Sequence, residues 1–260
     1  MPEFSEATTG RFCWVELQAK DPVAARKFYG ELFGWTYDEM PMPSGTYATA
    51  KVGDKLVAGV MQLPEEAAKM GVPPNWGSYV AVDDVKASTE AAAKLGGKVL
   101  VGPTPMGPGT FSVIQDPTGG VVMLWHTTRS MGTMLYGEPG ALTWNELVST
   151  NVDIAQRFYT QLFGWTAEAQ AQPNMVYTVF KNGADLVGGM MAQPPDMKGA
   201  PSMWAVYFAV KDADATFATA TRLGAKVLMP ATDIPEVGRL GWLQDPQGAV
   251  FAIMKSSMPG

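Results

Sequence analysis

Apolar and polar residues follow one another along the chain with the periods of strands and amphipathic helices. Residues 12–18 are rich in aromatic and branched side chains and contain neither glycine nor proline, which is typical of a strand. Asp21 offers an N-cap before Pro22, and apolar residues then recur at helical spacing until Gly34. This pattern predicts a strand followed by a helix that ends at Gly34.

The pattern of a strand, a helix and further strands occurs again later in the first half. After strands at 46–52 and 56–62, a strand at 76–82 precedes a helix that runs between Asp84 and Leu95. The turn-forming residues that follow separate three shorter strands, near 98–101, 110–115 and 120–126. The first half therefore reads as two βαβββ units.

The chain is a tandem duplication. Residues 14–35 align without gaps on residues 144–165, and 10 of these 22 positions are identical. The segment QDPTGGV at 115–121 matches QDPQGAV at 244–250. This repeat predicts two domains joined by a linker, with the boundaries 1–128, 129–140 and 141–260.

Composition limits the classes of function. Of the 260 residues, 47% are hydrophobic and 17% are charged, which predicts a globular protein. The net charge is −6 without a cluster of lysines and arginines, so we expect no nucleic-acid partner. A single cysteine, Cys13, and a single histidine, His126, exclude an intramolecular disulfide and a site with two imidazoles. Because no apolar run of 18 residues and no signal peptide stand out, we expect a cytoplasmic protein with no membrane partner.

Tandem βαβββ units with an Asp-Pro-x-Gly segment near the end of each half, at 116–119 and 245–248, resemble the vicinal oxygen chelate superfamily. Its members include glyoxalase I, extradiol dioxygenases and bleomycin-resistance proteins. The W-x-E-L openings at Trp14 and Trp144 look closest to a two-domain actinobacterial group, which includes a mycobacterial antigen and proteins labelled hydroxylases. The resemblance implies an α+β fold of two tandem glyoxalase/bleomycin-resistance-like domains. In each, paired βαβββ units would form a curved mixed sheet with helices on its convex face.

The resemblance also implies four positions, in each half, that usually hold a divalent metal on the concave face. In this sequence they fall on Trp14, Gly59–Met61, Ser78 and Met123, and on Trp144, Gly189–Met191, Val206 and Ala252. Such side chains are unable to ligate a hard cation or ligate it poorly. We therefore expect neither a metal nor another cofactor, and neither glyoxalase nor extradiol dioxygenase activity. His126 is three residues beyond Met123, on the opposite face of the strand, and we expect it to be structural.

Strand alternation predicts what lines each cup, as we call the concave face of each sheet. If Trp14 points inward, so do Phe12 and Glu16, whereas Cys13 and Val15 face the helices. Tyr47, Tyr177 and two tryptophans, Trp76 and Trp204, are further candidates for the walls, although the sequence does not fix their direction. The predicted ligand-binding residues are Trp14, Tyr47, Ser78, Met123, Trp125, Trp144, Tyr177 and Trp204.

Glu16 and Glu146 are the candidate catalytic residues. A carboxylate inside an apolar cup has a raised pKa and could act as a general base or pair with a cationic ligand group. The alternative is structural, since a buried glutamate can bind backbone amides or a tyrosine.

Three functions remain open on the sequence alone. The first is a metal-free protein that binds a small hydrophobic or aromatic molecule in the cups. The second is a metal-independent, or unusual-metal, lyase, isomerase or oxygenase-type enzyme that uses Glu16 or Glu146 as base. The third is a noncatalytic interaction module whose cups are filled by their own side chains. Whether cups form within or across halves also stays open, as does a monomeric or homodimeric state. Met131, Met134 and Tyr136 of the linker could cross a cleft or bridge the halves.

Overall fold

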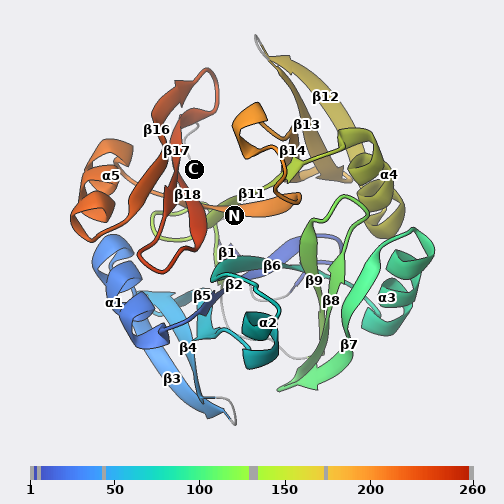
Figure 1. The fold of residues 1–260 in the computed structure, drawn as a ribbon, viewed down its shortest axis with the longest axis horizontal. Helices are drawn as coiled ribbons and strands as arrows, with labels where there is room; N and C mark the ends of the chain where they lie inside the picture. The colour runs from blue at the N-terminus through green and yellow to red at the C-terminus, as the bar shows by residue number, and fades with distance from the viewer. Residues whose placement is uncertain (1–2, 5–6, 43–44, 129–133, 173–174, 258–260) are drawn as a thin grey trace.

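The protein consists of two large curved sheets with helices between them (Figure 1). The computed structural model describes residues 3–4, 7–42, 45–128, 134–172 and 175–257. The elements of the first half are β2 (Phe12–Ala19), α1 (Pro22–Phe33), β3 (Thr36–Met42), β4 (Gly45–Val52), β5 (Lys55–Gln62), α2 (Glu65–Lys69), β6 (Asn75–Ala81), α3 (Val85–Lys94), β7 (Lys98–Met106), β8 (Gly109–Gln115) and β9 (Val121–Thr127).

The second half repeats this order closely. Its elements are β11 (Leu142–Ser149), α4 (Val152–Phe163), β12 (Thr166–Gln172), β13 (Met175–Asn182), β14 (Asp185–Ala192), the 3-10 helix η1 (Pro195–Met197), β15 (Met203–Ala209), α5 (Ala213–Arg222), β16 (Lys226–Ile234), β17 (Gly238–Gln244) and β18 (Val250–Ser256). Two further short strands, β1 (Glu3–Phe4) and β10 (Met134–Leu135), join the first sheet.

Each half builds its own sheet. The order in the first is β3-β4-β5-β2-β6-β9-β8-β7, with β2 parallel to β5 and antiparallel to β6. The second sheet repeats this arrangement as β12-β13-β14-β11-β15-β18-β17-β16. The two βαβββ units of one half thus share a cup, which answers the question that the sequence left open. The predicted α+β fold of two tandem, curved mixed sheets is confirmed.

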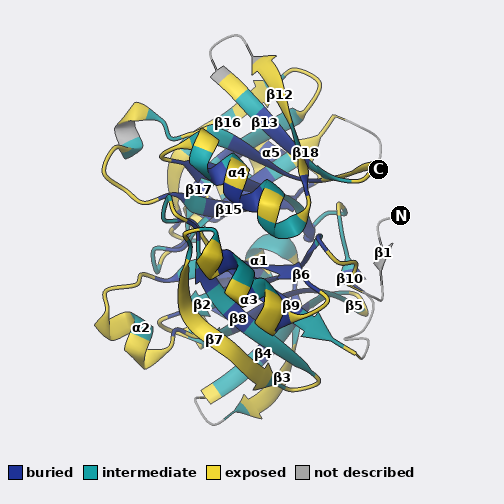
Figure 2. Ribbon diagram, turned by 90° about the vertical axis from the view of Figure 1, so that its right-hand side faces the viewer, coloured by how far each residue is buried: buried dark blue, intermediate teal, exposed yellow. Residues whose placement is uncertain are grey.

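The two hydrophobic cores, in contrast, combine residues of both halves. Figure 1 shows the sheets back to back, with α1 beside α5 on one side and α3 beside α4 on the other. Phe28 and Tyr29 of α1 are buried in one core with Phe208 and Phe251 of the second half. The other core joins Tyr159 of α4 and its neighbours to residues of the first half. Buried residues accordingly gather where the sheets meet (Figure 2).

Two buried tyrosines link the halves by hydrogen bonds. The Tyr29 hydroxyl accepts a hydrogen bond from Trp76 Nε1 at 2.9 Å and donates one to Asp245 Oδ2 at 3.0 Å. Asp245 belongs to the Asp-Pro-x-Gly turn, and its Oδ1 accepts from the backbone N–H groups of residues 247–249. The bond to Asp245 therefore fixes helix α1 of the first half against the turn that precedes the last strand of the second.

The same arrangement is present on the opposite side of the molecule. Trp204 Nε1 donates to the Tyr159 hydroxyl at 2.8 Å, and this hydroxyl donates to Asp116 Oδ2 at 2.7 Å. The duplicated sequence thus produces two equivalent links, and each residue type is kept in both.

Two parts of the sheet differ from the sequence-based prediction. Residues Thr36–Met42 form a strand that was missed, because this edge strand is mostly exposed and carries Asp38, Glu39 and Pro41 in place of an apolar alternation. Met134 and Leu135 of the predicted linker form β10, which pairs with β1 and, in parallel, with β5. Met131 lies outside the described residues.

A β-bulge corrects the predicted facing of the first strand. The register between β2 and β6 shifts between Phe12 and Trp14, so Phe12 and Trp14 point to opposite faces. Phe12 packs in the helix-side core against Trp165 and Trp204, with ring centroids 5.8 and 5.1 Å apart. Cys13 packs on the cup side instead. The prediction that Phe12 lines the cup and Cys13 faces the helices is therefore wrong.

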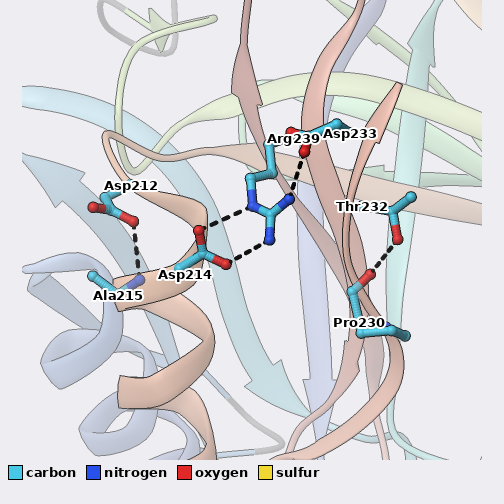
Figure 3. A network of polar contacts seen from close by, with 7 residues as sticks. All are labelled: Asp212, Asp214, Ala215, Pro230, Thr232, Asp233 and Arg239. Atoms are coloured by element: carbon cyan, nitrogen blue, oxygen red, sulfur yellow. Dashed lines mark hydrogen bonds and ion pairs between the residues drawn. The ribbon is translucent and has the colours of Figure 1, made fainter. Parts of the chain in front are cut away.

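An arginine on the helix-facing side of the second sheet ties α5 to two strands (Figure 3). Arg239 of β17 donates to both carboxylate oxygens of Asp214, at 3.0 and 2.8 Å, and to Asp233 of β16 at 2.9 Å. Both carboxylates are exposed, so we expect this network to contribute little to stability. None of the helices in the described ranges is long and apolar enough to cross a membrane.

Removing the hydroxyl of Tyr29 tests the link between the halves. Tyr29→Phe leaves Asp245 Oδ2 and Trp76 Nε1 without their buried partner, and we expect a loss of about 1–3 kcal/mol of unfolding free energy. Tyr37→Phe is the matched control, because the buried Tyr37 hydroxyl has no hydrogen-bond partner in the described chain. Urea denaturation of both variants gives the comparison. Equal stability losses would contradict the role assigned to the Tyr29 bonds.

Candidate functional site

The first cup contains a buried carboxyl group with tyrosine hydroxyls around it. Trp14 Nε1 donates to the Tyr47 hydroxyl at 3.0 Å, and the Tyr79 hydroxyl donates to Glu16 Oε1 at 2.9 Å. Glu16 is 2% exposed, and its second oxygen, Oε2, is buried without a partner of hydrogen-bonding geometry among the described residues. The Tyr47 hydroxyl also faces this carboxyl group.

The second cup repeats this polar group with one addition. Trp144 Nε1 donates to the Tyr177 hydroxyl at 2.9 Å, and the Tyr207 hydroxyl donates to Glu146 Oε1 at 2.7 Å. Trp242 Nε1 donates to Tyr207 at 2.8 Å, at a position where the first half has Val113. In this series each donor points toward the carboxyl group: the indole N–H donates to a tyrosine hydroxyl, and the Tyr207 hydroxyl donates to Glu146.

Glycine at one position of each cup permits the tyrosine to approach. A Cβ atom on Gly59 would lie 2.3 Å from the Tyr47 hydroxyl oxygen, and one on Gly189 would lie 1.9 Å from that of Tyr177. Both distances are too short for any side chain. The two glycines, which pair with Glu16 and Glu146 in the parallel ladders, therefore keep the tyrosines over the carboxyl groups.

Burial changes the acidity of the cup residues. It raises the pKa of both Glu16 and Glu146 above the usual value, and the neighbouring tyrosine hydroxyls oppose this shift. Burial also raises the pKa of the Cys13 thiol to about 12, so this cysteine stays protonated and is a poor nucleophile at neutral pH.

The two cups differ in how far their aromatic lining is covered. Trp14, Tyr79, Met123 and Trp125 of the first cup are each at most 5% exposed and form a cluster with Met134. In the second cup the lining side chains that remain partly exposed are Trp144, Met203, Leu240, Trp242 and Met254. Glu146 beneath them is only 6% exposed. The second cup therefore presents an accessible aromatic surface around a buried carboxyl group.

The structure brings most of the predicted lining together in the cups but places Ser78, Trp76 and Trp204 elsewhere. Trp14, Tyr47, Met123 and Trp125 lie in the first cup. Ser78 points to the opposite face of β6, where its hydroxyl donates to Asn145 Oδ1 at 2.6 Å.

Tryptophans 76 and 204 also lie on the helix side. Trp76 and Trp204 donate to Tyr29 and Tyr159 and belong to the two cores. Trp76, Trp204 and Ser78 were candidates for the cup walls, and this placement is corrected. The residues of β6 and β15 that face the cups alternate with these three along the strands. Trp144 and Tyr177 lie in the second cup as predicted.

Three important residues of the site were missed by the sequence analysis. Tyr79 and Tyr207 hold the carboxyl groups, and Trp242 extends the second relay. Both faces of β6 and β15 are buried, so polar and apolar alternation did not reveal which face points into the cup. The signal that could have found the tyrosines is their repetition, since Tyr79 and Tyr207 occupy equivalent positions in the two halves.

The residues on the concave faces do not fit a chelated divalent metal. Each cup contributes one glutamate, and its other polar or sulfur-containing groups are tyrosine hydroxyls, thioethers and indoles, joined in the first cup by the buried Cys13 thiol, which stays protonated. A protein site for such a cation normally has three or more imidazole, thiolate or carboxylate ligands. In the described portion of the sequence, no three His, Cys, Asp or Glu side chains come together in this way. His126 instead places Nδ1 3.0 Å from the Val82 carbonyl oxygen.

Comparison with known proteins agrees with this architecture. The sequence profile of the Glyoxalase/Bleomycin resistance protein/Dioxygenase superfamily matches twice, over residues 11–124 and 142–253. A protein of Mycobacterium bovis named "Putative glyoxylase CFP32" is 44% identical over 98% of both chains. The anthracycline biosynthesis protein DnrV of Streptomyces peucetius is 32% identical over 95% of this chain and 93% of its own.

Solved structures share the fold at low sequence identity. The Mn(II)-bound glyoxalase from Novosphingobium aromaticivorans has a TM-score of 0.65 at 17% identity, covering 96% of this chain and 83% of its own. The 2,2',3-trihydroxybiphenyl 1,2-dioxygenase from Sphingomonas wittichii has the same TM-score at 14% identity, covering 96% and 91%.

The titration of Glu16 gives a test of its environment. A carboxyl group whose pKa is raised by folding stabilises the folded state below its unfolded pKa, near 4.5, and this contribution is lost as the pH rises through the folded pKa. The unfolding free energy of the wild type should therefore fall relative to that of Glu16→Gln above about pH 4.5, by at most about 1.4 kcal/mol per pH unit. Urea denaturation across this range measures both. A difference that does not change with pH would contradict the raised pKa.

Proposed function

We propose that this chain, which belongs to the Glyoxalase/Bleomycin resistance protein/Dioxygenase superfamily, binds a small hydroxyl-bearing aromatic molecule in its second cup. The observation that carries the proposal is a partly exposed set of aromatic and sulfur-containing side chains above the buried carboxyl group of Glu146. Flat aromatic molecules pack well on such side chains, and one buried polar group is enough to orient them.

The polar contacts of the second cup favour a ligand that donates a hydrogen bond. Trp242 donates to Tyr207, which donates to Glu146, and Trp144 donates to Tyr177. The hydrogens of both indoles and of the Tyr207 hydroxyl are engaged in these bonds and the Tyr177 hydroxyl faces Glu146, so the carboxylate lone pairs are the acceptors left for a ligand. A phenolic hydroxyl on an aromatic ring supplies such a donor. The 32% identity to a protein named for anthracycline biosynthesis also favours an aromatic ligand.

The raised pKa of Glu146 supports a second candidate function. A carboxyl group whose pKa is raised by burial in a partly open apolar cup is a stronger base than an exposed one, so a metal-independent enzyme that uses Glu146 to accept a proton is the alternative. The first cup, where Trp14, Met123 and Trp125 are at most 5% exposed, fits the noncatalytic reading better.

Binding of 2-naphthol tests the main proposal, because this molecule combines a flat ring system with one hydroxyl donor. We expect isothermal titration calorimetry to show one site per chain. Glu146→Gln should weaken binding roughly 10- to 100-fold, since a hydrogen bond to a charged acceptor is replaced. Glu16→Gln is the matched control, because it makes the same change in the covered cup and should leave the affinity within about twofold. Absence of binding to the wild type, or equal losses in both variants, would overturn the proposal.

We also propose that the fold requires no chelated metal, on the basis of the donor set of the cups. A metal that binds only the folded state raises the melting temperature, so its removal lowers it. Dialysis against EDTA should leave the melting temperature of the protein, measured by calorimetry, unchanged within about 1 °C. A decrease of several degrees that added Mn²⁺ or Zn²⁺ reverses would contradict the proposal.

A further inference from the structure

The two cups have almost the same polar floor. The distance between the tryptophan Nε1 and the tyrosine hydroxyl is 3.0 Å in the first cup and 2.9 Å in the second. The distance between the second tyrosine hydroxyl and the glutamate is 2.9 Å in the first and 2.7 Å in the second. If one floor recognises a hydroxyl-bearing aromatic molecule, the other carries the groups to do the same.

The two cups differ in that a segment beside β5 packs a methionine side chain into the apolar cluster of the first cup. We call residues Met134–Leu135, strand β10, the strap. Met134 is 8% exposed and belongs to the same apolar cluster as Trp14, Tyr79 and Met123. Beside it, Leu56 of β5 pairs with Met134 and is packed against this cluster.

The equivalent surface of the second cup is more exposed among the described residues. Leu186 of β14 corresponds to Leu56, and it is 48% exposed. Trp144, the counterpart of the buried Trp14, is partly exposed. The side chain of Met134 therefore contributes to the difference in accessibility between the two cups, beside substitutions in the lining such as Met123 for Ala252.

The strap is held by few backbone contacts. Its two residues pair with Glu3 and Phe4 of β1, and Met134 pairs with Leu56 of β5. Such short ladders open more readily than the long strands of a sheet. The apolar packing of Met134 in the cup is thus a main part of what holds the strap in place.

Met134 fills the apolar part of the cup but not its polar part. Glu16 Oε2 is buried and has no partner of hydrogen-bonding geometry among the described residues. The thioether of methionine has no hydrogen to donate. A molecule that combines an aromatic ring with a hydroxyl group would replace the packing of Met134, and its hydroxyl would give Glu16 Oε2 a donor in addition to the Tyr47 hydroxyl that faces this carboxyl group.

We propose that the first cup is a second binding site for hydroxyl-bearing aromatic molecules, which the Met134 side chain of the strap occupies in competition with the ligand. The inference rests on the proposed function for the choice of ligand. Competition of this kind lowers the apparent affinity of the first cup by the fraction of time that the strap is displaced.

Calorimetry with 2-naphthol tests this inference on the full chain. We expect one site in the wild type and two in Met134→Ala, whereas the control Met134→Leu, which keeps an apolar side chain of similar size, should retain one. Adding Glu16→Gln to Met134→Ala should weaken the new site at least tenfold and leave the other unchanged. One site in Met134→Ala would overturn the inference even where the wild type binds. No binding to the wild type would instead overturn the proposed function. In that case a new site in Met134→Ala would still support competition by the strap, and the lack of one would contradict it.

A measurement on the wild type covers the case in which Met134→Ala fails to fold. With methionine methyl groups labelled by carbon-13, the Met134 signal is assigned from its absence in Met134→Leu. We expect this signal to move when 2-naphthol is added in excess over the amount that fills the second cup. A Met134 signal that stays unchanged while the second cup fills and the ligand reaches saturation would contradict displacement of the strap.

Discussion

The Tyr29 hydroxyl connects three elements that are distant in the sequence: helix α1, strand β6 through Trp76, and the turn before β18 through Asp245. Tyr159 does the same for α4, β15 and the turn before β9. Since β9 and β18 carry Met123 and Ala252 into the cups, the position of each cup wall depends on a helix of the other half. The helices are also buried in cores that both halves supply. Each half therefore forms its own sheet, but each hydrophobic core is built from residues of both halves.

The features that the sequence predicted correctly are those written in local patterns. The N-caps at Asp21 and Asp84, the C-cap at Gly34 and the repeated Asp-Pro-x-Gly turns each depend on a few neighbouring residues. These signals predicted the helices, whereas the duplication was predicted from the aligned halves and the α+β fold from the resemblance to a known superfamily.

The features that the sequence did not predict depend on contacts between distant segments. On β6, Ser78 and Tyr79 lie on opposite faces, yet both are buried, so no polar side marked the direction of the cup. The bulge between Phe12 and Trp14 reverses alternation at one point. The tyrosine links across the halves were also out of reach, because Tyr29 and Asp245 are 216 residues apart and have no local pattern in common. The candidate site predicted from periodicity alone therefore included the correct strands, but on β6 it included the residue that faces away from the cup.

Covalent fusion of two homologous halves has an evolutionary consequence. In a symmetric dimer of identical subunits, any substitution changes the binding cups of both subunits at once. Here Met123 of the first half corresponds to Ala252 of the second, and Val113 corresponds to Trp242. The tyrosine and glutamate that form the hydrogen bond in each cup are the same in both halves. In a single polypeptide one cup can therefore keep its ancestral lining while the lining of the other changes. A homodimer encoded by one gene is unable to do this.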